Sequence, residues 1–329
     1  MKLSRHQFLR LAAGAVALPA VSSIARAQTY PARPITMVVP FPAGGSIDVL
    51  ARILAEPMTA ALGRAMVIED VGGAAGNIGV GRVARAAPDG YTLSLATGDQ
   101  FVANGAIYPL QYDVVKDFAP IALLAGSPYL IVSKNDVPAK DLKELIAWLT
   151  ANHAKVSQGH LGVGGAMHLC GLDMQKVART QWQMVPYRGA APALQDLLGG
   201  QIDVMCPFPG SGLGLVRSGK LRAYAVAANT RLASAPEIPT VDEAGFPGMY
   251  ISGWACLFAP RGTPKDVIAR LNAVVVTVLA DLGVRRRISE LGMEIPPREQ
   301  QTPEALGAFQ KAEIEKWWPI IKAANIKGE

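Results

Sequence analysis

Short apolar runs alternate along the chain with segments whose apolar positions recur every three or four residues. The apolar runs are four to eight residues long and rich in Val, Ile and Leu, as is typical of strands covered on both faces. They lie at 37–41, 67–70, 92–97, 121–125, 129–133, 155–160, 183–187, 202–206, 222–227 and 253–260. This alternation predicts α/β lobes with mainly parallel sheets flanked by helices.

The pattern becomes helical after Pro264. Apolar residues recur at helical spacing over 267–282 and over 303–324, and we expect both segments to pack as closing helices on the first domain.

The first 27 residues have the features of an export signal. Basic residues precede an apolar run, and Ala25-Arg26-Ala27 has the small-x-small pattern of a cleavage site. The run is shorter than the ~20 residues that span a bilayer, which disfavours an uncleaved anchor. A twin-arginine motif with His6 in place of its second arginine leaves the Sec and Tat routes both open. We expect cleavage near Ala27 and a periplasmic mature chain of about 302 residues, a length that suggests two domains.

The positive charge belongs mostly to the signal. Residues 1–27 hold four basic and no acidic residues, so 28 basic and 26 acidic residues remain of the original 32 and 26. The remaining lysines and arginines are scattered and not interleaved with aromatic residues, so we expect no nucleic-acid partner.

A glycine-rich turn joins the first predicted strand to a helix. The strand at 37–41 runs into a Pro-Ala-Gly-Gly turn, and Ser46 opens a helix with apolar residues at helical spacing. The first N–H groups of a helix have no partner within it, and glycine has no Cβ to keep a ligand from the backbone. The junction therefore offers main-chain donors to an anion, although a tight turn alone would use the same glycines.

Two more strand-to-helix junctions share this arrangement. They follow the strands at 67–70 and 155–160, and their glycines are Gly72, Gly73 and Gly76, and Gly162, Gly164 and Gly165. In open α/β sheets ligands bind beyond the carboxyl ends of strands, where these loops lie. Three such junctions indicate a ligand cleft more strongly than one.

Motifs for catalysis or metal binding are scarce. The segment 79–84 matches GxGxxA, and Asp99 follows about 20 residues after Gly79, as in the fingerprint of dinucleotide-binding sites. However, the motif falls inside a predicted helix, where this fingerprint does not occur. The sequence has no GxSxG, GxxxxGK[ST] or HExxH motif. His160 and His168 are eight residues apart with no carboxylate spaced as a third ligand, which disfavours a metal site. A catalytic triad could still assemble in space, but nothing in the sequence requires one, and we expect no enzyme activity and no cofactor.

The three cysteines are widely spaced and match no CxxC pattern, so at most one bridge could form. We interpret all three as small core residues, namely Cys170, Cys206 and Cys256.

Several motifs together resemble one family. In order, the chain contains PFPAGGSIDVLAR, VIEDVGGAAGNIG, APDGYTL, YDVVKDFAPIALLAGSPYLIV, GVGGAMHLCGL, MVPYRGAAPALQDLLGGQIDVM, SGKLRAYAV and LFAPRGTPKDVIARLN. These are similar to motifs of the Bug or TctC-type solute-binding proteins of tripartite tricarboxylate transporters, across essentially the whole mature chain. The resemblance implies a two-lobed type II periplasmic binding protein with its ligand between the lobes and a membrane permease as partner. We assign 28–124 and 229–329 to lobe 1 and 125–228 to lobe 2, and expect a monomer.

Matching the family's motifs position by position implies a set of ligand-binding residues. In lobe 1 they are Phe41, Ala43, Gly44, Gly45, Asp48, Ala74, Ala75, Thr97 and Gly98; in lobe 2 they are Ser127, Gly164, Gly165, Ala166, His168, Tyr187 and Arg188. Asp48 has an alternative role as a first-turn carboxylate that the helix dipole favours. His168 has one as an ordinary helix residue.

Three positions depart from the family pattern. Pro207 stands where many relatives have an acidic residue, Gly165 where serine is frequent, and Asp99 where small residues are usual. A carboxylate at Asp99 disfavours a purely anionic ligand.

The sequence thus predicts a binding protein for a small organic acid, with an amino acid or an aromatic carboxylate as further possibilities. An enzyme on the same two-lobed frame and a sensor that feeds a signalling partner are the alternatives.

Overall fold

A computed structural model describes residues 30–187 and 189–328. The predicted export signal at 1–27 and the predicted ligand contact Arg188 lie outside the described residues. Among the residues described, no single helix is long and apolar enough to cross a bilayer, and one pair of helices bent by 77° passes that test only when taken together.

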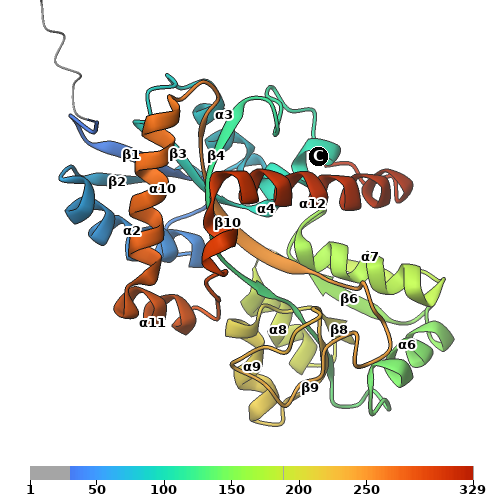
Figure 1. Ribbon diagram of the computed structural model, residues 1–329. Helices are drawn as coiled ribbons and strands as arrows, with labels where there is room; N and C mark the ends of the chain where they lie inside the picture. The colour runs from blue at the N-terminus through green and yellow to red at the C-terminus, as the bar shows by residue number, and fades with distance from the viewer. Residues whose placement is uncertain (1–29, 188, 329) are drawn as a thin grey trace, which may run out of the picture.

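Two five-stranded sheets form two lobes (Figure 1). The first has the order β2-β1-β3-β10-β4, with β1 Ile35–Val39, β2 Met66–Asp70, β3 Thr92–Thr97, β4 Phe118–Pro128 and β10 Ser252–Pro260. The second has the order β7-β6-β8-β5-β9, with β5 Leu130–Lys134, β6 Ser157–His160, β7 Gln183–Pro186, β8 Val204–Met205 and β9 Leu221–Val226. In each sheet one strand, β10 or β5, runs antiparallel to its neighbours. The predicted two-lobed α/β fold with mainly parallel sheets is confirmed.

Helices cover both sheets, as their apolar strands require (Figure 1). The first sheet carries α2 Ser46–Leu62, η1 Ala74–Gly76, α3 Asn77–Ala84, α4 Gly98–Phe101, α5 Asn104–Ile107, α10 Lys265–Ala280, α11 Leu282–Glu290, η2 Arg298–Gln301 and α12 Pro303–Ala323. The second carries α6 Leu142–Ala151, α7 Ala166–Ala178, α8 Ala190–Leu198 and α9 Pro209–Arg217. Along β1, Met37 and Val39 join a core cluster with α2 and α10, whereas Val38 joins another with α3 and α12. Alternate residues of the strand therefore serve two cores.

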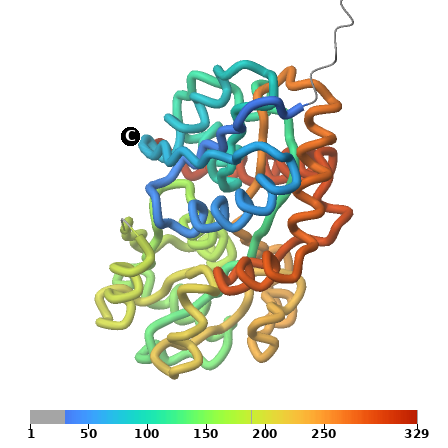
Figure 2. Tube along the Cα trace, turned by 90° about the vertical axis from the view of Figure 1, so that its left-hand side faces the viewer, coloured from blue at the N-terminus to red at the C-terminus, as the bar shows by residue number. Residues whose placement is uncertain are grey.

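Two segments of chain that pass between the lobes lie side by side. The first passes from β4 through Tyr129 into β5, and the second returns from β9 through 227–251 into β10. The N–H of Tyr129 donates to Ile251 O at 3.0 Å, and the N–H of Ala227 donates to Tyr129 O at 2.8 Å. In Figure 2 the blue and red ends of the chain gather in one lobe and the yellow segments in the other.

The assignment of residue 229 to lobe 1 stays a prediction. Leu232, Ala235 and Ile238 pack in a cluster with Leu130 and other residues of the second sheet. These contacts indicate that the chain returns from lobe 2 to lobe 1 nearer residue 251 than residue 229.

All three cysteines are buried core residues, as interpreted, but two of them form the one bridge that three cysteines allow, so reading these two as simple core residues is wrong. Cys170 in α7 is bonded to Cys206, the residue after β8. Both sulfurs are buried, and the bond fixes α7 on the second sheet. Cys256 is buried with a free thiol, as interpreted.

Candidate functional site

A cleft of about 750 Å³ lies between the two lobes. Loops at the carboxyl ends of β1, β3 and β6 contribute to its wall, together with the segments that pass between the lobes. Seven of the residues predicted to bind a ligand line it: Phe41, Ala43, Gly45, Thr97, Gly98, Gly165 and Ala166.

The start of α2 forms one end of the cleft. Gly45 caps the helix with extended backbone angles, φ −72° and ψ 163°, and no side chain caps it. The N–H groups of Ser46 and Ile47 have no acceptor within the helix, and both residues line the cleft. This helix start therefore presents main-chain donors to the cleft.

Asp48 holds the loop that precedes this helix. Its Oδ2 accepts the N–H of Gly44 at 2.7 Å, and Gly44 has a φ of +82°, which favours glycine. Its Oδ1 lies 2.8 Å from Arg52 Nε. Burial raises the pKa of Asp48, but the hydrogen bonds from Arg52 and Gly44 outweigh it and lower the pKa. Asp48 is buried behind the loop and positions Gly44 instead of lining the cleft.

The start of α7 repeats this construction on the second lobe. Gly165 caps it with φ −67° and ψ 159°, and Gly164 before it has a φ of +79°. The N–H of Gly164 donates to Nδ1 of His168 at 3.2 Å, four residues on, as Gly44 donates to Asp48. Ala166 and Met167 line the cleft, and their N–H groups are left free by the helix.

His168 is a neutral acceptor in this arrangement. Its pKa is lowered to about 4 because burial and the neighbouring His160 both disfavour the charged ring. The two imidazole centroids are 4.6 Å apart. His168 therefore positions Gly164 across the physiological pH range and does not line the cleft.

Two more helix starts, which the sequence pattern does not identify, reach the cleft. Gly189 and Ala190 lie at the start of α8, and Gly210 and Ser211 at the start of α9. Helix N-termini carry partial positive charge, so the four starts give the cleft wall a partial positive potential. No Lys or Arg of the described chain lines the cleft.

Aromatic rings form much of the apolar wall. Tyr129 and Phe208 pack edge to face with centroids 5.5 Å apart, and Trp254 lies against Gly98, where a Cβ would overlap its indole. Tyr129 and Trp254 come from segments that pass between the lobes, and Phe208 follows β8. Local sequence patterns carry no signal for these residues, because only the tertiary fold brings them to the cleft.

The other predicted contacts among the described residues lie outside the cleft wall. Ala74 and Ala75 are exposed residues of η1, and the carbonyl oxygen of Ala75 accepts the side-chain amides of Gln100 at 3.1 Å and Asn104 at 3.0 Å. Ser127 is buried, and Tyr187 donates its hydroxyl to Asp196 at 2.8 Å. Among the described residues no cluster of His, Cys, Asp or Glu could hold a metal ion.

Comparison with known proteins identifies relatives along most of the chain. Residues 50–326 match the model of the tripartite tricarboxylate transporter family receptor. The protein BugT of Bordetella pertussis is 33% identical over 95% of this chain and 95% of its own length.

Solved structures of similar sequence share the fold. The periplasmic binding protein BugD is 38% identical with a TM-score of 0.76, over 91% of this chain and all of that one. MatC of Rhodopseudomonas palustris, solved with bound malate, is 38% identical with a TM-score of 0.77 over 89% of this chain and all of that one. Rpa4515 of R. palustris, solved with adipate, is 30% identical with a TM-score of 0.78, over 91% of this chain and 99% of that one.

Proposed function

Because this chain belongs to the tripartite tricarboxylate transporter receptor family, we propose that it captures a small organic acid between its lobes and delivers it to a tripartite tricarboxylate-type permease. The family consists of periplasmic solute-binding proteins, and the proposed role involves no chemical change of the ligand. The malate and adipate bound to the two similar structures are both organic acids, which supports this ligand class.

The paired starts of α2 and α7 are the observation that carries the proposal. Each is a Gly-Gly turn whose first glycine is held by a polar side chain four residues on, and each leaves N–H groups free at the cleft. A hydrogen bond to a charged group contributes roughly 1.5 to 3 kcal/mol net. A few such bonds can supply the roughly 8 kcal/mol of micromolar binding after the cost of association.

The test is to add a side chain at the two capping glycines, so that it sterically blocks access of the ligand to these N–H donors. We expect Gly45→Val and Gly165→Val each to weaken carboxylate binding by at least about tenfold, roughly 1.4 kcal/mol. Both glycines have negative φ, and an added Cβ would meet its nearest neighbour at 3.4 Å and 3.5 Å respectively, so the variants should fold. Isothermal titration calorimetry with malate and other small carboxylates measures the change.

Gly214→Val is the matched control. Gly214 is an exposed helix residue outside the cleft, with no atom within 4 Å of an added Cβ. We also expect Arg188→Ala to cost less affinity than either cleft variant. Normal binding by both cleft variants, with binding abolished by Arg188→Ala, contradicts main-chain recognition.

A further inference from the structure

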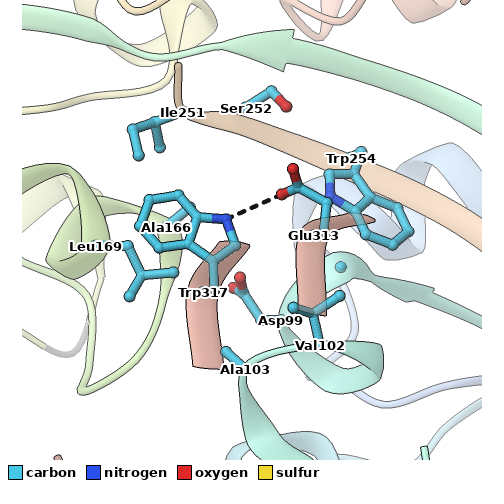
Figure 3. A pocket seen from close by; sticks show the side chains of 11 residues that line it. Asp99, Val102, Ala103, Ala166, Leu169, Ile251, Ser252, Trp254, Glu313 and Trp317 are labelled. Atoms are coloured by element: carbon cyan, nitrogen blue, oxygen red, sulfur yellow. Dashed lines mark hydrogen bonds between the residues drawn. The ribbon is translucent and has the colours of Figure 1, made fainter. Parts of the chain in front are cut away.

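Asp99 stands at the boundary between the cleft and a smaller cavity behind it (Figure 3). It is the second residue of α4, directly after β3. The smaller cavity has about 20 Å³, room for one water-sized group, and Trp254 and Trp317 line it together with Glu313. Figure 3 shows the carboxylates of Asp99 and Glu313 within this small space.

The carboxylate of Asp99 is the one charged group that the described residues bring to the cleft wall. The other side chains of that wall are apolar, aromatic or hydroxyl-bearing. No hydrogen bond within the described part of the chain satisfies Asp99, and burial raises its pKa to about 6, so it is still mostly ionised at pH 7.5. Asp99 is partly buried, and a partly desolvated charge without a partner favours a ligand that supplies the opposite charge.

Asp99 also lies beside the start of α7. Its Oδ2 is 3.8 Å from the position that a Cβ on Gly165 would occupy. The negative charge of Asp99 therefore already offsets the partial positive charge of this helix start. A second carboxylate of a ligand placed beside Asp99 would meet a like charge, whereas the N–H groups that the starts of α2 and α7 present to the cleft remain available for a first carboxylate.

Building on the function proposed above, we propose that Asp99 determines ligand class: the ligand carries a protonated amine in addition to its carboxylate, and the amine binds against Asp99. The rings of Tyr129 and Trp254 line the same part of the wall and can stabilise a cation through their faces. The chain would then prefer an amino acid to the dicarboxylate of equal length.

Glu313 provides a matched control because it is a second carboxylate of the same small cavity that does not line the cleft. Its Oε2 accepts the indole N–H of Trp317 at 3.0 Å, a bond that the carbonyl oxygen of glutamine can keep. Glu313→Gln therefore removes a nearby acid without changing the group that faces the ligand.

The experiment compares three matched sets of unbranched compounds with four, five and six carbons: dicarboxylates, ω-amino acids and diamines. Calorimetry at pH 7.5 measures their affinities for the wild type, Asp99→Asn and Glu313→Gln. We expect the tightest amino acid to bind the wild type at least about tenfold more tightly than the dicarboxylate of equal length. Asp99→Asn should remove this preference, and Glu313→Gln should change it by less than about threefold.

The outcomes separate this inference from the function on which it rests. Tighter binding of dicarboxylates by the wild type, or a preference that Asp99→Asn leaves unchanged, overturns the role of Asp99 and leaves organic-acid binding intact. Binding of diamines without binding of any acid keeps Asp99 as a cation site and overturns the proposed function. Failure of all nine compounds to bind contradicts both.

Discussion

At the scale of single residues, the ionised carboxylate of Asp99 lowers the stability of the ligand-free protein. Burial raises its pKa from 3.8 to about 6, so between these values the folded state binds more protons than the unfolded state. The free energy of unfolding therefore falls as pH rises through this window and stays lower above it. Such a cost at a binding site is expected where the ligand supplies the missing charge.

Asp99→Asn should stabilise the ligand-free protein near neutral pH. Because Asp99 is partly exposed in the cleft, the expected gain at pH 7.5 is smaller than the roughly 3 kcal/mol that corresponds to the full pKa change. The gain should vanish below about pH 4, where the aspartate is protonated. Thermal or urea unfolding at both pH values measures it. Contributions of the nearby Glu313, Tyr129 and His168 are common to both proteins and largely cancel in the difference. An equal gain at both pH values means that charge is not its cause.

At the scale of elements, α7 is fixed at two points. His168 holds the Gly164 loop before it, and the Cys170–Cys206 bond ties its second turn to the residue after β8. The loop that the disulfide closes spans a separation of 36 residues. A crosslink over a loop of this size typically contributes about 2 to 4 kcal/mol to stability.

Reductant should therefore lower the unfolding temperature of the wild type. The same treatment should hardly change the unfolding temperature of Cys206→Ala, which has no disulfide to lose. It should lower the unfolding temperature of Cys256→Ala as much as that of the wild type. Differential scanning calorimetry with and without reductant measures this, and alkylation of the unfolded, unreduced protein should label Cys256 alone. Labelling of all three thiols in exported protein contradicts the pairing.

The elements could be predicted largely from the sequence, because strand and helix patterns are local. The helix that begins at Ser46 and the one that follows Gly165 were recognisable from their glycines, since the backbone itself forms these turns. The disulfide was not, because a separation of 36 residues carries no spacing motif. Trp254 and Phe208 were missed for a related reason: their place in the cleft depends on tertiary packing alone. The roles of Asp48 and His168 could not be predicted from the sequence, because they depend on hydrogen bonds from Gly44 and Gly164 that only the structure shows.

At the scale of the whole molecule, the segments that pass between the lobes are hydrogen-bonded side by side. Tyr129 bonds to Ile251 and Ala227, and Lys316 of α12 donates to Tyr250 O at 2.6 Å. Adjacent crossings of this kind allow one lobe to rotate against the other as a rigid body.

Ligand should close the cleft and make the molecule more compact. Small-angle X-ray scattering of the wild type with and without saturating ligand should show a smaller radius of gyration with it. Gly45→Val at the same ligand concentration should show less compaction, because it binds less. Saturated binding of the wild type with no change in scattering contradicts closure by rotation.

The proposed use of backbone donors at the starts of α2 and α7 has a consequence for how such a pocket can diversify. A grip made of main-chain N–H groups is retained when neighbouring side chains change, provided that the two glycines stay. Substitutions at positions such as Asp99, Phe208 or Trp254 can then change which other groups of the ligand the cleft accepts, while the main-chain donors for the carboxylate stay in place. One scaffold can in this way serve a lineage of receptors for different nutrients, each separated from the next by few substitutions.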